Sequence, residues 1–288
     1  MASLPRLATG TRALDYDLMT LVGVVASLLV AGAAAGIMAG MLGVGGGIVI
    51  VPVLFHLFTM VGIAEEIRMH LAVGTSLSTI IATGAMSTRS HHRRGSVDWT
   101  LLKSWGPAVA IGVLMGTALA TAMSAGGLKA IFATVAILVA LYMAFAPDGL
   151  RLADRLPGNP SRFGMGAVIG GISAMMGIGG GTLSVPSMVL CGYPPKRAVG
   201  TSSAIGLIIA IPGTIGFMIT GFEAEGLPPV SLGYVSLIGF ALIVPTTMAF
   251  APVGARIAHA VSPQLLKRLF ALFLAITSLR MFWEIFAG

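Results

Sequence analysis

Two glycine triplets are the residues of this chain whose type and spacing could do chemistry. Residues 41–52 read MLGVGGGIVIVP and residues 175–186 read MMGIGGGTLSVP. A helix that starts after each triplet, at Ile48 or Thr182, presents unpaired N–H groups and the positive end of its dipole. Glycine lets a ligand approach such a backbone closely, and helix starts of this kind bind anions. We therefore expect a small anion at Gly45, Gly46, Gly47, Gly179, Gly180, Gly181 and Thr182.

The alternative for the triplets is that they only allow helices to pack closely. Against that alternative, the two copies occupy matched places, and each is followed five residues later by a proline, Pro52 or Pro186. If the triplets hold an anion, valine at Gly46 or Gly180 should abolish anion flux without unfolding the protein. Valine at Gly32, away from both triplets, should have much less effect.

A second repeated motif, AVGTS, occurs at 72–76 and again at 198–202. It supplies hydroxyl groups, which are neutral donors suited to an oxyanion that must be bound and then released. The hydroxyls could equally bond to the preceding helical turn or across to a neighbouring helix. Both interpretations stay open for the four candidates, Thr75, Ser76, Thr201 and Ser202.

The composition points to a membrane protein. Charged residues make up 9% of the 288 residues and hydrophobic residues 56%, whereas a soluble domain carries about 25% charged residues. The net charge of +7 does not indicate nucleic acid, because the bases lie in short loops between apolar segments. One cysteine excludes a cysteine cluster for a metal, and no nucleophile–base pairing is evident. We expect no cofactor and no enzyme, and as partners a small anion and the lipid bilayer.

Ten apolar segments divide the chain, and a helix needs about 20 residues to cross the hydrocarbon. The segment 182–192 is too short to cross alone, so 163–177 and 182–192 form either two short helices that meet inside the membrane or a re-entrant hairpin. The same choice between spanning and re-entering stays open for the matching segment 47–62. The expected fold is an all-α polytopic membrane protein with broken or re-entrant half-helices at the triplets. The segments are 18–40, 47–62, 71–90, 99–124, 128–147, 163–177, 182–192, 198–221, 230–251 and 265–287.

The order of sequence markers indicates a duplicated unit. Pro107 and Gly116 recur at a constant spacing as Pro245 and Gly254, and Leu128-Lys129 recurs as Leu266-Lys267. We expect an N-terminal half over 1–147, a cytoplasmic linker over 148–162 and a C-terminal half over 163–288. Each half holds an odd number of segments, so the halves should insert with opposite orientation, as in inverted-repeat transporters.

Loop charge predicts the orientation of the chain. If the loop with Arg93 and Arg94 is cytoplasmic, twelve lysines and arginines fall on the cytoplasmic side and five on the outer side. That excess follows the positive-inside rule. Both termini are then expected on the outer, periplasmic side.

The paired G-x-G-G-G and AVGTS motifs in a duplicated hydrophobic chain resemble the TauE/SafE family, the sulfite exporter family. The similarity covers about 18 to 287. It implies a bacterial inner-membrane transporter that exports a small sulfur-containing anion such as sulfite or sulfoacetate. A passive anion channel is one alternative, because paired half-helices could also form a filter. A membrane assembly factor that transports nothing is the other.

His56 is a candidate for proton coupling. It lies deep in an apolar segment, its repeat counterpart is Leu190, and an ionisable residue within a membrane segment is a functional hypothesis by default. Histidine titrates near neutral pH and could carry a proton with the anion. A packed, neutral histidine is the alternative.

Overall fold

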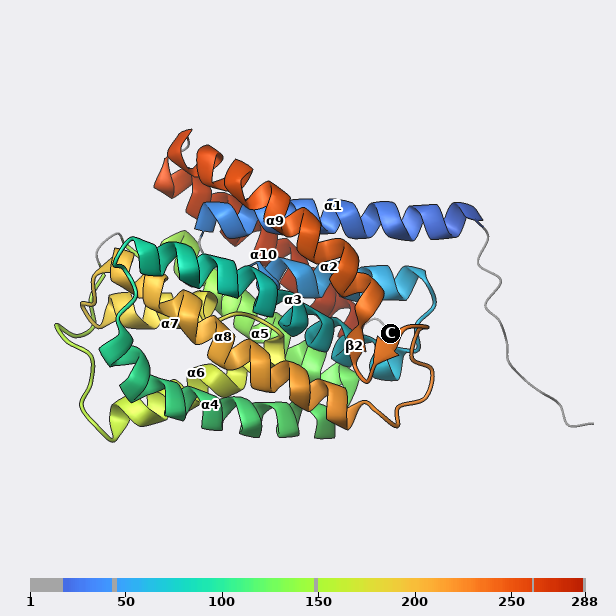
Figure 1. The fold of residues 1–288 in the computed structure, drawn as a ribbon, viewed down its shortest axis with the longest axis horizontal. Coiled ribbons are helices and arrows are strands. Elements are labelled where there is room, and N and C mark those ends of the chain that lie inside the picture. Colours follow the sequence, from blue (N-terminus) through green and yellow to red (C-terminus); the bar gives the residue numbers. More distant parts are fainter. Residues whose placement is uncertain (1–17, 43–45, 148–149, 261, 287–288) are drawn as a thin grey trace, which may run out of the picture.

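The computed structural model describes residues 18–42, 46–147, 150–260 and 262–286. Within these ranges the chain forms ten helices and one two-stranded hairpin (Figure 1), which confirms the all-α expectation. The elements are α1 Leu18–Leu42, α2 Gly47–Met60, α3 Glu65–Arg93, α4 Trp99–Ala122, α5 Ala125–Phe145, α6 Ser161–Met176, α7 Gly181–Leu190, α8 Pro195–Thr220, β1 Ser231–Leu232, β2 Val235–Ser236, α9 Leu237–Ala260 and α10 Pro263–Phe286.

Seven of the described helices, α1, α3, α4, α5, α8, α9 and α10, are long and apolar enough to cross a membrane. The apolar helices α2 and α7 are shorter, at 14 and 10 residues. Large apolar side chains such as Val30, Met115 and Leu279 are more than 60% exposed. Lipid can cover such surfaces, so the protein is a multi-pass membrane protein.

Left-handed glycines interrupt the helices where the triplet motifs lie. Gly177 has φ 66° and closes α6, with its own N–H bonded to Ala174 and that of Ile178 bonded to Ser173. This pair of bonds is a Schellman-type helix end. Gly46 has φ 75° and stands immediately before α2. Both conformations favour glycine, so these two positions account for the breaks in the helices.

The two short helices point to opposite faces of the molecule. α7 ends at Leu190, whose carbonyl accepts hydrogen bonds from the N–H groups of residues 152 and 153. The start of α4 lies on the same side, where Tyr193 bonds to Asp98. We call this side of the molecule the cavity face, because a cavity lies toward it. α2 ends beside the end of α10, where His56 meets Glu284; we call this side the opposite face. The long helices run between these faces along a common direction (Figure 1).

Four pairs of helices make the most extensive contacts: α1 with α9, α4 with α6, α3 with α8, and α5 with α10. Small residues allow the close approach. A Cβ on Gly36 would come 2.5 Å from the carbonyl oxygen of Thr247 in α9, and one on Gly170 would overlap the backbone of Val109 in α4. Glycine-mediated packing of this kind is typical of membrane helices.

The boundaries of the ninth segment differ from the predicted range 230–251. Residues 231–236 form the hairpin, and α9 begins only at Leu237 and continues to Ala260. Gly233 turns the chain with φ 52°, and the Tyr234 N–H bonds to the carbonyl of Phe217. The Ser236 hydroxyl accepts the Gly239 N–H and caps α9. This local capping outweighs the apolar character of the preceding residues.

Candidate functional site

The interruptions in the two halves meet in the centre of the molecule. The Ser76 hydroxyl donates to the Gly177 carbonyl at 2.7 Å and lies 3.4 Å from the Gly47 carbonyl. A Cβ on Gly47 would come within 2.9 Å of the Gly177 oxygen and 3.1 Å of the Ile178 Cα. The sequence motifs from both halves are thus brought together in one buried region.

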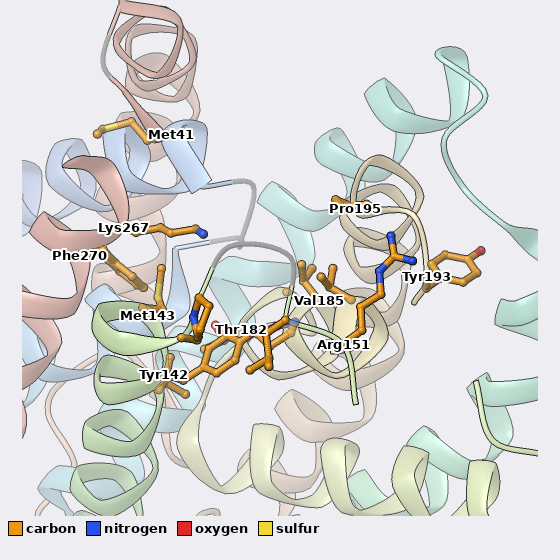
Figure 2. Close-up of a pocket in the computed structure, with 17 residues that line it drawn as sticks. Met41, Tyr142, Met143, Arg151, Thr182, Val185, Tyr193, Pro195, Lys267 and Phe270 are labelled. Carbon is orange, nitrogen blue, oxygen red and sulfur yellow. The ribbon is translucent and has the colours of Figure 1, made fainter. Parts of the chain in front are cut away.

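A cavity of about 480 Å³ adjoins the start of α7 and lies toward the cavity face. Its lining is mainly apolar, and two cationic side chains, Arg151 and Lys267, take part in it. In the view of Figure 2, Thr182 lies between these two cations. Other residues that line the cavity are Val139, Tyr142, Met143, Ala146, Gly181, Val189, Tyr193 and Phe270.

The first turn of α7 offers unpaired donors to this cavity. Ser184 N is bonded to Gly180 O, whereas the N–H groups of Gly181 and Thr182 stand in the first turn, before the helical ladder begins. The Thr182 hydroxyl is buried, at 4% exposure, and has no hydrogen-bond partner among the described residues. The positive helix end, this hydroxyl and the two nearby cations together suit a small anion.

The start of α2 is packed more tightly. Gly46 accepts bonds from the N–H groups of Val49 and Ile50, and Ile48 is only 1% exposed. Neither Gly46 nor Gly47 lines the cavity. Gly45 lies outside the described residues.

Gly179 and Gly180 are also buried, and the second of them makes a close backbone contact. A Cβ on Gly180 would stand 2.8 Å from the Ser202 carbonyl and 2.9 Å from the Gly206 nitrogen in α8. A valine there must therefore displace backbone, contrary to the expectation that it would spare the fold. The expectation for Gly32 is also wrong, because its Cβ would overlap the Thr246 hydroxyl in α9.

The threonines of the two AVGTS motifs receive backbone hydrogen bonds from the other half. Thr75 Oγ1 accepts the Ser236 N–H at 2.9 Å, at the start of α9. Thr201 Oγ1 accepts the Asp98 N–H at 3.0 Å, at the start of α4. The hydroxyl of Ser202 donates to Val199 O at 2.9 Å in its own helix. The motif thus joins helix starts across the two halves.

Sequence reasoning missed the pair formed by Tyr193 and Asp98. The tyrosine hydroxyl donates to Asp98 Oδ2 at 2.6 Å, and Asp98 Oδ1 accepts the Leu101 N–H as the cap of α4. Both hydrogen bonds lower the pKa of Asp98, and the one from Tyr193 has the larger effect. Burial and the same bond raise the pKa of Tyr193 to about 12. An aspartate just before the apolar run at 99 was the available helix-start signal.

His56 lies on the opposite face, away from the cavity. Its Nδ1 is 3.6 Å from Glu284 Oε1, and its ring meets that of Phe55 edge-on, with centroids 5.6 Å apart. Glu284 also pairs with Arg280 at 3.4 Å. The histidine therefore belongs to a charged group at the end of α10, which remains compatible with either proton transfer or packing.

Residues 28–281 match the family described as Sulfite exporter TauE/SafE. The chain belongs to this family. Over 254 residues it is 32% identical to a probable membrane transporter protein of Haemophilus influenzae, covering 88% of this chain and 96% of that protein. It is 27% identical to the probable membrane transporter protein MJ0441 of Methanocaldococcus jannaschii, with 88% and 94% covered.

A third relative is the probable membrane transporter protein YunE of Bacillus subtilis, 30% identical over 67% of this chain and 78% of that protein. No solved structure matches the chain. As a TauE/SafE protein with transporters as relatives, the chain is a membrane transporter and not an enzyme.

Proposed function

We propose that this TauE/SafE protein is a secondary transporter that carries a small sulfur-containing anion, such as sulfite or sulfoacetate, out of the cell. The observation that supports it most is the start of α7. There, unpaired N–H groups and the unpaired, buried Thr182 hydroxyl adjoin a cavity that also contains Arg151 and Lys267. An oxyanion supplies the acceptors that these donors lack.

We place the cavity face in the cytoplasm of a bacterial inner membrane, with both termini periplasmic. The loops at this face contain Arg93, Arg155 and Lys196, and the positive-inside rule puts such basic loops inside. An exporter collects its cargo from that side. The opposite face would then be the side of release.

We further propose that residues 1–147 and 163–288 are inverted halves joined by a cytoplasmic linker over 148–162. Two features support this. α2 and α7 run from the centre toward opposite faces, and the pairing of α1 with α9 corresponds to the pairing of α6 with α4 when the halves are exchanged. The remaining pairs, α3 with α8 and α5 with α10, each consist of two equivalent helices, so exchanging the halves leaves these pairs unchanged. A two-fold axis within the membrane plane produces such a pattern.

In this proposal the two glycine triplets form two half-sites. The α7 half-site, with Gly179, Gly180, Gly181 and Thr182, adjoins the cavity through Gly181 and Thr182. The α2 half-site, with Gly45, Gly46 and Gly47, serves the other state. Among the AVGTS hydroxyls, that of Ser76 joins the two triplet regions, those of Thr75 and Thr201 hold the starts of α9 and α4, and that of Ser202 bonds within its own helix. Direct contact with the anion would require them to release the backbone groups to which they are bonded.

Purified protein in liposomes tests the proposal. Uptake of radiolabelled sulfite should saturate, and sulfite loaded inside the liposomes should accelerate it by exchange. Current without exchange would instead support the anion channel. Absence of both would refute anion transport. If His56 carries a proton with the anion, His56→Gln should flatten the pH dependence of this uptake, and an unchanged pH profile would assign it to packing.

A further inference from the structure

The duplicated unit relates the cavity to a second region on the opposite face. The constant spacing that maps Lys129 to Lys267 also maps Phe132 to Phe270 and Arg280 to Tyr142. The spacing of the triplets maps Phe55 to Val189. Lys267, Phe270, Tyr142 and Val189 all line the cavity. Their counterparts Lys129, Phe132, Arg280 and Phe55 therefore mark where an equivalent cavity would lie on the opposite face.

That region is closed in the structure. Lys129 is 4% exposed and Phe55 2%, whereas their counterparts in the cavity, Lys267 and Val189, are partly exposed. Met281, the counterpart of the cavity residue Met143, is 0% exposed. The cavity lies at one of two related places, and the side chains at the other place are more deeply buried.

Lys129 is an unusual residue for such a packed place. Its ammonium lies 3.8 Å from Glu65 Oε1, a carboxylate whose side chain is 68% exposed, and 5.3 Å from the centre of the Phe55 ring. A buried cation in a membrane helix is costly and usually functional. One ion pair to a solvated carboxylate and one ring leave an ammonium that can donate three hydrogen bonds only partly compensated.

Phe55 covers this lysine from α2. A second cation, Arg68, lies 5.7 Å from the centre of the same ring and is held by two bonds to the Ile63 carbonyl. The ring therefore lies beside two cations, both close enough for a cation–π attraction. A displacement of α2 would remove the ring and expose the ammonium of Lys129 to the opposite face.

We propose that Lys129 binds the transported oxyanion when the protein opens to the opposite face, and that Phe55 closes this second site in the state seen here. This inference rests on the proposed function and on the inverted halves. Lys267 and Lys129 would then contact the same anion in turn, one from each side of the membrane. A change of conformation, rather than a permanently open path, would connect them.

Sided transport measurements test the proposal. In right-side-out and inside-out membrane vesicles, Lys129→Met should raise the KM for sulfite by about tenfold on the opposite face only. Lys267→Met should raise it on the cavity face only, and Lys129→Arg should stay close to wild type. The exposed Lys103→Met is the matched control and should change neither value. Equal KM changes on both faces, or none, would overturn the role of Lys129.

A second measurement covers the case in which Lys129→Met does not fold. Cys191 is the only cysteine of the chain, so Thr277→Cys can be added to a Cys191→Ser background. Thr277 is 9% exposed and is the counterpart of the cavity residue Val139. A membrane-impermeant thiol reagent should modify it only from the opposite face, and faster in a Phe55→Ala variant. Ala146→Cys should react from the cavity face.

No modification of Thr277→Cys from the opposite face, in wild-type or Phe55→Ala background, would refute a second cavity there. Wild-type protein that transports no sulfite would instead refute the proposed function. The two failures are therefore distinct, because the thiol measurement requires only a folded protein that changes its conformation.

Discussion

The two half-helices α2 and α7 begin with the same glycine pattern but meet different surroundings. Ile48 and Ile50 follow the first triplet and are both 1% exposed, packed within the core. Thr182 and Ser184 take the matching places after the second triplet, and neither hydroxyl has a partner among the described residues. The triplet thus makes a helix start in both halves. The residues that follow it decide whether polar donors are left available there.

The unpaired hydroxyls of Thr182 and Ser184 lower the stability of the fold. A buried donor without a partner costs about 1–3 kcal/mol, and α7 carries two of them where α2 carries isoleucines. Thr182 borders the cavity, where an anion can satisfy it. The chemical difference between the half-helices therefore agrees with the difference in access, since the polar start adjoins the cavity and the apolar start is closed.

The largest expected effect concerns the close contact of the second triplet. Gly180→Val should largely abolish recovery of folded, monodisperse protein, because its side chain must push the backbone of α8 away from Ser202 and Gly206. Gly164→Val, in α6 where a Cβ would meet nothing within 4 Å, is the control and should purify normally. Size-exclusion profiles and Tm measure both. A normal Tm for Gly180→Val would mean that α7 can move away from α8 at little cost, whereas the start of α2 is fixed by its packing.

The next effect tests the polar difference directly. Thr182→Val makes the start of α7 resemble that of α2 and should weaken sulfite binding about five- to tenfold, as expected for one lost hydrogen bond. Folding should be retained, since the substitution preserves shape. Isothermal titration on purified protein measures the affinity.

Thr214→Val is the matched control for that experiment. Thr214 is 3% exposed, its hydroxyl is also unpaired among the described residues, and it does not line the cavity. Its substitution should leave the affinity unchanged. If both variants bind sulfite as tightly as wild type, the difference between the half-helices is unrelated to the anion.

The sequence predicted much of this architecture. The apolar runs located all ten described helices, because lipid-facing helices require long apolar stretches. The α9 boundary was predicted less well, since a hairpin and a serine cap depend on local bonds that hydropathy does not report. The shift of that helix start by seven residues, from 230 to 237, is the result.

The candidate site was predicted only in outline. The triplets indicated helix starts, but the asymmetry between them depends on packing between helices far apart in the sequence. The close contact of Gly180 with α8, for example, joins segments that no local pattern connects. The role of Tyr193 likewise depends on the approach of Asp98 from the other half, at 2.6 Å.

The smallest expected effect concerns a second difference between the halves, at the helix starts bonded to the AVGTS threonines. α4 is capped by the ionisable Asp98 and α9 by the neutral Ser236. The Tyr193 hydroxyl lowers the pKa of Asp98 below its ordinary value of 3.8. A lowered carboxyl pKa stabilises the fold above the ordinary value, and this contribution is lost as the pH falls through the folded-state pKa.

Asp98→Ser copies the neutral cap and removes that titration while keeping a cap for α4. At neutral pH the variant should melt a few degrees below wild type, because the charged bond to Tyr193 is gone. As the pH falls below 3.8, the Tm difference should shrink, since wild type loses its own contribution there. Other carboxyl groups titrate in both proteins and cancel in the difference. A Tm gap that stays constant down to that range would mean that the two caps are equivalent and that the charge of Asp98 contributes nothing to folding.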